Sequence, residues 1–143
     1  MSSTAMPLLS FNFRVEIDGL TVGAFREVTG LSGDTTMVEY RDGSDAVRST
    51  RKGPGLHSFP NIVLKRGYTT NREMWDWYRN IANGISDKRN GSIFLQNETH
   101  QDVMQWDFVN AWIKKIDGPS FNATANEIAV ETIELVHEGV SLA

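Results

Sequence analysis

The chain has 143 residues, of which 40% are hydrophobic and 22% charged, and this composition predicts one globular domain spanning residues 1–143. It contains no cysteine, which excludes disulfides, thiolate metal sites and cysteine nucleophiles. The 18 acidic residues against 14 Lys and Arg give a net charge of −4, which argues against direct nucleic-acid recognition. No apolar run approaches the ~20 residues of a membrane helix, and the first residues lack the pattern of a secretory signal.

The first predicted elements are strands. Apolar and polar residues alternate over residues 11–17, which predicts a strand with one dry and one wet face. The turn dipeptide Asp18-Gly19 follows, and residues 20–28 are predicted to return as the second strand of a hairpin. Residues 35–40 are rich in Thr, Val and Tyr and predict a third strand.

Residues 42–60 have neither helical nor strand periodicity and are predicted as a long loop, a kind of segment that is usually functional or disordered. This loop is basic, whereas the protein as a whole is acidic. A solvated loop is the ordinary interpretation, but apolar residues among charged ones are typical of an interface and favour contact with a partner. The predicted contact residues are Asp42, Asp45, Val47, Arg48, Arg51, Lys52, Leu56 and Phe59.

A short strand over residues 61–66 leads to the one predicted helix, at residues 70–83. Thr70 and Glu73 have the spacing of a capping box at its start. An apolar stripe at helical spacing predicts the face that packs on the core. The stripe consists of Met74, Trp77, Tyr78, Ile81 and Ala82. Trp75 lies off the stripe, so we expect a partner subunit to bury it.

Three further strands are predicted over residues 92–97, 103–116 and 127–137. The apolar period slips in the last two, which predicts a bulge or bend in each. About seven strands in hairpin order and one helix predict a mainly β (α+β) fold. Its architecture is an antiparallel β-barrel or sandwich flanked by the helix, with Trp77, Trp106 and Trp112 in or near the core.

The sequence contains few residue patterns that are typical of catalytic or metal-binding sites. No nucleophile elbow or phosphate loop is present, and no metal-ligand spacing is found among the histidines, which we expect at the surface or at an interface. The histidines are His57, His100 and His137. The acids of the last strand are better explained by a solvated edge than by acid–base chemistry. They are Glu127, Glu131 and Glu134. We therefore predict no enzyme, no catalytic residue, no metal and no cofactor.

Five segments that together span most of the chain carry a resemblance. They are FNFRVEIDG at residues 11–19, AFREVTGL at 24–31, VEYRDG at 38–43, NIVLKRG at 61–67 and MWDWY at 74–78. In this order and in a chain of this length, the set resembles the inner-tube proteins of contractile phage tails and contractile injection systems. Secretion-system tube proteins of the haemolysin-coregulated type share their fold.

The resemblance implies a structural subunit whose hexameric rings stack into a hollow tube, which sheath contraction drives through a target envelope. It implies four kinds of partner: other copies, the contractile sheath protein, baseplate or tube-initiator proteins, and a cargo or effector in the lumen. It also implies a protein made in the cytoplasm and assembled into a phage tail or a tail-like extracellular particle. The loop at 42–60 would then reach a neighbouring ring or subunit.

The same resemblance implies that the sheet faces the lumen. The polar positions of the first strand, Asn12, Arg14 and Glu16, would line a water-filled channel, where mixed charges keep cargo from adhering. Two other classes of function remain open beside the tube subunit. One is a monomeric small β-barrel that binds a ligand among its Trp residues. The other is a small β-barrel enzyme, for which no convergent acid, base and nucleophile are found.

Overall fold

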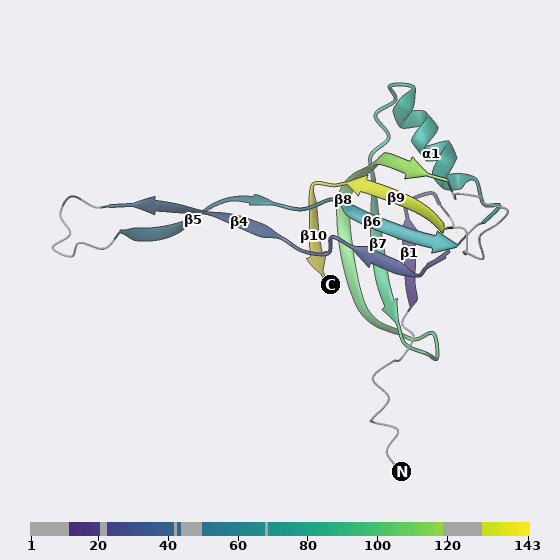
Figure 1. Cartoon of the computed structure of the whole chain (residues 1–143), viewed down its shortest axis with the longest axis horizontal. Coiled ribbons are helices and arrows are strands. Elements are labelled where there is room, and N and C mark those ends of the chain that lie inside the picture. Colours follow the sequence, from purple (N-terminus) through teal and green to yellow (C-terminus); the bar gives the residue numbers. More distant parts are fainter. Residues whose placement is uncertain (1–11, 21–22, 42, 44–49, 68, 119–129) are drawn as a thin grey trace, which may run out of the picture.

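The computed structural model of the chain describes residues 12–20, 23–41, 43, 50–67, 69–118 and 130–143. An eight-stranded sheet forms a body with a helix beside it, and a two-stranded arm projects from this body (Figure 1). The predicted mainly β fold with one flanking helix is therefore confirmed for these residues. None of the described helical residues form a helix long and apolar enough to cross a bilayer.

The strands of the body pair antiparallel throughout, in the order β2-β1-β7-β8-β9-β6-β3, with β10 on β8. Their bounds are β1 Asn12–Ile17, β2 Ala24–Phe25, β3 Glu27–Thr29, β6 Ile62–Gly67, β7 Arg89–Gln96, β8 Asp102–Asp117, β9 Val130–Val136 and β10 Gly139–Leu142. The terminal strands β2 and β3 do not pair with each other, so the described sheet is a curled open sheet and not a hydrogen-bonded barrel. Only Arg26 separates these two strands in the chain.

The long strand β8 connects the two halves of the sheet. Its first part pairs with β7 and β10, and its second part pairs with β9. Asn110 has a φ of 52°, and the register with β7 shifts between Arg89 and Gly91, so the bend predicted in this strand is confirmed. In β9, buried and half-buried residues alternate without a break. The bulge predicted there is wrong for the described residues, since the extra residue lies in β8, between Ile113 and Lys115.

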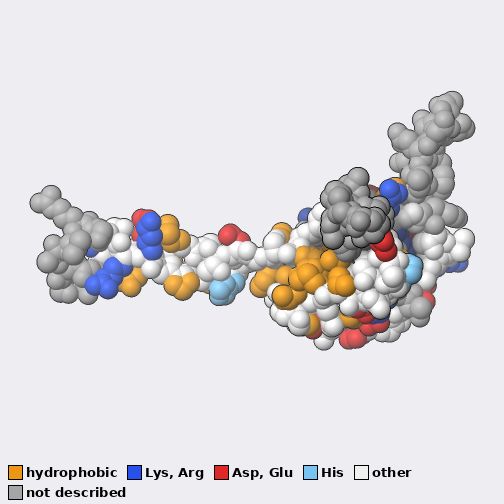
Figure 2. Space-filling model, turned by 90° about the horizontal axis from the view of Figure 1, so that it is seen from below, with side chains coloured by type: hydrophobic (Ala, Val, Ile, Leu, Met, Phe, Trp, Pro, Cys, Tyr) orange, Lys and Arg blue, Asp and Glu red, His pale blue; other side chains and the backbone are white. Residues whose placement is uncertain are grey.

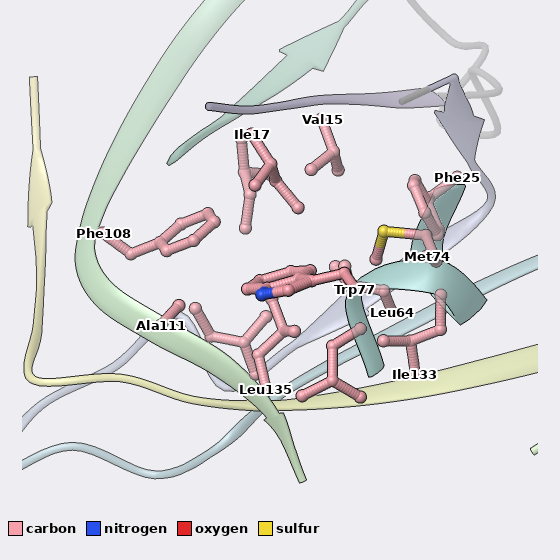
Figure 3. Packing of buried hydrophobic residues seen from close by; sticks show 13 residues of the cluster. Val15, Ile17, Phe25, Leu64, Met74, Trp77, Phe108, Ala111, Ile133 and Leu135 are labelled. Carbon is pink, nitrogen blue, oxygen red and sulfur yellow. The ribbon is translucent and has the colours of Figure 1, made fainter. Parts of the chain in front are cut away.

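The core lies between the curled sheet and helix α1, which spans Glu73–Ala82 (Figure 3). Trp77 and Met74 of the helix are buried among side chains from β1, β2, β6, β8 and β9. The labelled core residues are Val15, Ile17, Phe25, Leu64, Met74, Trp77, Phe108, Ala111, Ile133 and Leu135. Trp106 and Trp112 are half-buried, and neither is among the partly buried residues that pack on the core, so only Trp77 is confirmed as a core residue.

The helix starts later than the sequence predicts. It begins at Glu73, whose N–H donates to Asn71 Oδ1 at 2.8 Å, while Asn71 N–H donates to Thr69 Oγ1 at 3.1 Å. These local bonds form a short turn before the helix and supply an acceptor at its first residue. The capping box predicted from Thr70 and Glu73 is therefore wrong.

Part of the predicted loop is a strand of the arm. Its strands are β4 Asp34–Tyr40 and β5 Arg51–Ser58, paired antiparallel, so residues 51–58 are a strand and not a loop. This strand is not predicted from residue propensities, because it contains Gly53, Pro54 and Gly55, and glycine and proline are rare in strands. In an isolated two-stranded ribbon each strand is an edge, and an edge strand accommodates a proline that cannot donate a ladder hydrogen bond.

Candidate interaction surfaces

The arm exposes apolar side chains that its own protomer does not cover. Every residue of β4 is exposed, and Met37, Val38 and Tyr40 of this strand are each about half accessible to solvent. Leu56 on β5 is 81% exposed. Such a long apolar ribbon is an aggregation risk unless another surface covers it. The arm is therefore the first candidate for contact with another molecule.

Two glycines shape one face of the arm. A Cβ added at Gly55 would lie 2.4 Å from Thr36 Oγ1 and 3.0 Å from Val38 Cγ2. A Cβ added at Gly53 would lie 3.6 Å from Tyr40 Cε1. The side chains of β4 thus lie across the glycines of β5, and Thr36 Oγ1 accepts a hydrogen bond from Leu56 N–H at 2.8 Å. The result is a thin ribbon with Val38 and Tyr40 on the same face.

The arm also carries basic charge. Arg51 and Lys52 are exposed and pair in register with Tyr40 and Glu39, and Lys and Arg side chains gather on its outer half (Figure 2). Four of the predicted contact residues lie outside the described residues. They are Asp42, Asp45, Val47 and Arg48.

Phe59, another predicted contact residue, lies at the root of the arm. Its ring centroid is 5.8 Å from that of His137, which is buried and not at the surface as expected for the histidines. His137 Nδ1 accepts a hydrogen bond from Gly139 N–H at 3.1 Å, so Nε2 is the protonated nitrogen and donates to the Pro60 carbonyl at 3.0 Å. These contacts attach the end of β5 to β10 and fix the root of the arm on the body.

The body presents a second apolar surface at one end of the sheet. Figure 2 views the molecule from this end and shows apolar side chains next to the root of the arm. Met104 of β8 and Leu142 of β10 are exposed, and Leu142 pairs in register with Trp106, two residues from Met104 on the same face of β8. In Figure 1 the arm extends away from this surface, so its outer part does not cover it.

The outer face of β1 is polar, and the three residues predicted to line a channel lie on it. Asn12 and Arg14 are half-buried and Glu16 is exposed. Arg14 forms ion pairs with Glu16 and, at 2.7 Å, with Asp102 of β8, and its guanidinium lies 3.9 Å from the centre of the Phe94 ring. The Arg14 guanidinium holds the pKa of the Asp102 carboxyl below its ordinary value.

This polar face continues across β7 and β8. Glu16 pairs in register with Ser92, which in turn pairs with Asp107. The Ser92 hydroxyl and the Gln105 amide donate to Asp107 at 2.6 and 2.8 Å, and the bond from Ser92 lowers the pKa of Asp107. The charges named on this face are each bonded to a neighbour, and three carboxylates against one guanidinium leave the face negative.

Trp75 has partners within its own protomer. It is 39% exposed, its Nε1–H donates to Glu131 Oε1 at 3.0 Å, and its ring lies edge-on to Tyr78. The protomer already orients this indole, and its exposed part remains available for contact. Burial by a partner stays a prediction.

Sequence reasoning missed a buried ion pair. Arg66 and Glu131 are opposite each other on β6 and β9, and both side chains are buried. Glu131 is therefore not on a solvated edge as predicted, whereas Glu134 is half-buried and Glu127 lies outside the described residues. The alternation of apolar and polar residues along the two strands could have indicated this pair. Arg66 and Glu131 each occupy a core-facing position of a strand whose other core-facing positions are apolar.

The described residues hold no group of three or more His, Asp or Glu that could bind a metal ion. Of the remaining histidines, His57 and His100 are exposed. The arrangement of the described residues thus offers surfaces for contact and a polar sheet face.

In comparison with protein families, the family model for T4-like virus tail tube protein gp19 matches residues 9–141. A search among curated proteins finds no match. Among solved structures, a chain of the PVC sheath–tube complex in its extended state, an extracellular contractile injection system, is 29% identical with a TM-score of 0.74. The match covers 100% of this chain and 98% of that one.

Two further structures extend the comparison. A chain of the PVC sheath/tube terminator in its extended state is 31% identical, with a TM-score of 0.73, and the match covers 96% of this chain and 95% of that one. Hcp1 from Flavobacterium johnsoniae is 14% identical, with a TM-score of 0.56 and coverage of 92% and 94%. At that identity the likeness to Hcp1 shows a shared fold alone.

Proposed function

This chain belongs to the T4-like virus tail tube protein gp19 family, and from that premise we propose that its copies form hexameric rings that stack into a hollow tube. It is a tail tube subunit of a contractile injection system, and its role is structural and not enzymatic. It is a component of a phage tail or of an extracellular contractile injection particle. No observation on the described residues favours the alternative of a monomeric ligand-binding barrel.

The arm is the observation that carries the proposed assembly. Its apolar face and the apolar end of the sheet are both exposed, and within one chain the outer arm does not reach the sheet. A neighbouring copy brings the two surfaces together and buries both. Because the arm of one copy then meets the body of the next, the contact is head-to-tail, and repetition of such a contact builds a filament or tube.

Charge supports the same contact. The exposed bases Arg51 and Lys52 lie on the outer half of the arm, in a chain whose net charge is −4, so these side chains are attracted to acidic residues of another copy. Lys52 and Arg51 contribute to this attraction together with Arg48. Phe59 anchors the arm in its own protomer, while Leu56 and the apolar residues of β4 face the neighbour.

The polar face of β1, β7 and β8 is proposed to line the channel. Asn12, Arg14 and Glu16 would lie there beside Ser92 and Asp107. Their mutual hydrogen bonds and ion pairs leave few charges free to hold a passing molecule. Such a lining suits a conduit through which a cargo or effector moves.

The remaining partners follow from the place of a tube in a contractile apparatus. We propose that the outside of the stacked rings contacts the contractile sheath protein and that the first ring rests on baseplate or tube-initiator proteins. The protein would be made in the cytoplasm and assembled there into the particle. Sheath contraction would then drive the tube through a target envelope.

Charge reversal on the arm tests this proposal. Replacing Arg48, Arg51 and Lys52 with Glu should weaken ring stacking while the protomer stays folded, because none of the described residues of the arm contribute to the core. Sedimentation velocity and negative-stain electron microscopy measure assembly, and circular dichroism measures folding.

A matched control reverses three exposed lysines of the body, Lys88, Lys114 and Lys115, by the same substitution. Assembly that is equally weak in both triple variants would mean that only total charge matters. Unchanged assembly of the arm variant would contradict the role of the arm. A wild-type chain that stays monomeric at all salt and protein concentrations would contradict the tube itself.

A further inference from the structure

Arg66 and Glu131 form a buried pair in which the carboxylate is satisfied. Their side chains are 6% and 5% exposed. Arg66 Nε–H donates to Glu131 Oε2 at 2.5 Å, and Trp75 Nε1–H donates to Glu131 Oε1 at 3.0 Å. Both carboxylate oxygens therefore have a donor.

The guanidinium of Arg66 lies over the Phe25 ring, 5.2 Å from its centre, but not all of its hydrogen-bond donors are used. A guanidinium has five N–H donors and commonly binds a carboxylate through two of them. Arg66 Nη2 is buried and has no hydrogen-bond partner. Because nearly all buried polar atoms in folded proteins are paired, this atom points to an acceptor that the isolated protomer does not supply.

Arg66 also lines a pocket of about 310 Å³, which we call the Arg66 pocket. It lies between the start of β2, the end of β6 and the turn before α1. Its lining residues are Gly23, Ala24, Arg66, Gly67, Thr69 and Asn71. A Cβ added at Gly23 or Gly67 would meet no atom within 4 Å, so space is open beside these two lining residues.

The position of the pocket indicates where the acceptor comes from. Strand β2 is the terminal strand of the sheet, and beyond β1 it has no strand partner among the described residues. The Arg66 pocket thus lies where the curled sheet brings its margin at β2 next to β6, close to the opposite margin. In a ring built from identical subunits, a margin of this kind is where the next copy arrives.

We propose that the Arg66 pocket receives a carboxylate, from an Asp or Glu side chain of a second copy of this chain, which binds the Arg66 guanidinium. This proposal rests on the assembly proposed above. A carboxylate is the acceptor that best matches a guanidinium, and the chain has 18 acidic residues to provide one. Arg66 then binds Glu131 within its own subunit and an acidic side chain across the interface.

The first test examines the pocket in the free protomer. With arginine labelled by ¹⁵N, the Arg66 Nε–H signal is followed while sodium acetate is added, and a parallel titration uses sodium chloride at the same ionic strength. We expect a saturable shift with acetate that chloride does not produce. A shift of equal size with both salts, or none with acetate, would overturn the carboxylate site.

The second test fills the pocket. A Cβ at Gly23 meets no atom within 4 Å, so Gly23→Val should keep the melting temperature of the protomer while the affinity for acetate falls at least about tenfold. The matched control is Thr29→Val, an exposed position on β3 outside the pocket lining. It should bind acetate as the wild type does.

The third readout is assembly, by sedimentation velocity and electron microscopy. Gly23→Val should require at least about tenfold more protein to form rings, whereas Thr29→Val should assemble normally. Normal assembly of Gly23→Val alongside the wild type would overturn the role of a second copy and leave the tube proposal intact. If the wild type itself forms no rings, the tube proposal fails, and the acetate titration still decides whether the pocket is a carboxylate site.

Discussion

Asp87 holds together three parts of the body. Its carboxylate accepts two hydrogen bonds from Arg89, at 2.9 Å each, and one from Asn80 of the helix at 3.1 Å. Its carbonyl oxygen accepts a bond from Trp77 Nε1–H at 2.8 Å. Arg89 also donates to the carbonyl of Asp18, in the turn after β1, at 3.1 Å. A single residue in the segment after the helix therefore fixes α1 against β7 and the first turn.

This arrangement predicts a specific pH dependence. The Arg89 hydrogen bonds hold the pKa of Asp87 below its ordinary value of 3.8. Asp87 thus adds stability that is complete above that value and is lost as the pH falls through its lower folded pKa. Asp87→Asn should reduce the free energy of unfolding at pH 7, and its difference from the wild type should shrink as the pH falls from about 5 to about 2.

Urea denaturation at a series of pH values, followed by Trp fluorescence, measures this difference. Asp76→Asn is the control, because Asp76 is exposed and only 3.5 Å from Arg79 in a surface pair, which contributes little. Parallel stability curves for wild type and Asp87→Asn would contradict the assignment. The other acids with lowered pKa titrate in both proteins and cancel in the comparison.

The burial of single charged or polar residues was the feature that the sequence predicted least well. Glu131 and Arg66 are 65 residues apart, and only the pairing of β6 with β9 brings them together. From the sequence alone, Glu131 among other acids looks like part of a solvated edge. His137 likewise follows a strand end, and its burial depends on Phe59 and Pro60 from a distant segment. Such contacts are set by topology, which local patterns do not specify.

At the scale of elements, the bend of β8 depends on one residue. Asn110 adopts a left-handed backbone conformation, with φ at 52°, between the part of the strand that pairs with β10 and the part that pairs with β9. Its Nδ2–H donates to Glu138 Oε2 at 2.7 Å, and its backbone N–H donates to Asn90 Oδ1 at 3.0 Å. Asparagine tolerates this conformation better than most residues.

Substitution of Asn110 separates backbone strain from side-chain bonding. Asn110→Val should lower the free energy of unfolding by about 2 kcal/mol, because a β-branched residue is strained at positive φ. Asn110→Gly should cost clearly less, although it loses the same bond to Glu138. Urea denaturation gives both values. Equal losses in the two variants would show that the side-chain bond, and not the backbone conformation, is decisive.

The periodicity of the sequence predicted several elements well. The slip of the apolar period marked the bend of β8, and the apolar stripe placed Met74 and Trp77 of the helix in the core. The start of the helix was wrong because local bonds of Thr69 and Asn71 compete with the cap expected from Thr70. The strand over residues 51–58 was missed because its glycines lie opposite Val38 and Tyr40, and only pairing with β4 makes it a strand.

At the scale of the whole molecule, the body and the arm have separate roles. The described core residues all belong to the body and its helix, whereas the strands of the arm pair only with each other. The protomer therefore stabilises itself without the arm. This division is expected of a subunit that folds alone and uses a projecting element for contact with others.

Removal of the arm tests this division. Asp34 and Ser58 are directly paired, so a two-residue Asn-Gly turn placed between them closes the chain in place of residues 35–57. We expect the free energy of unfolding to change by no more than about 1 kcal/mol, since no described core contact is lost. Assembly should be abolished. Phe59 is retained so that its contact with His137 is unaffected.

Urea denaturation and sedimentation velocity measure the two effects on the same preparation. A shortened chain that is strongly destabilised would show that the arm supports the body. A shortened chain that still forms rings and tubes would show that other surfaces are sufficient for assembly.

The root of the arm has a mechanical consequence. Phe59, Pro60 and His137 set the direction in which the ribbon leaves the body. A seven-residue strand such as β4 is about 23 Å long, so a tilt of about 5° at the root moves the far end by about 2 Å. The arm therefore pivots about its root. Small changes in the packing of these side chains would alter the distance and the angle between successive copies, although the contact between the copies lies far from the root.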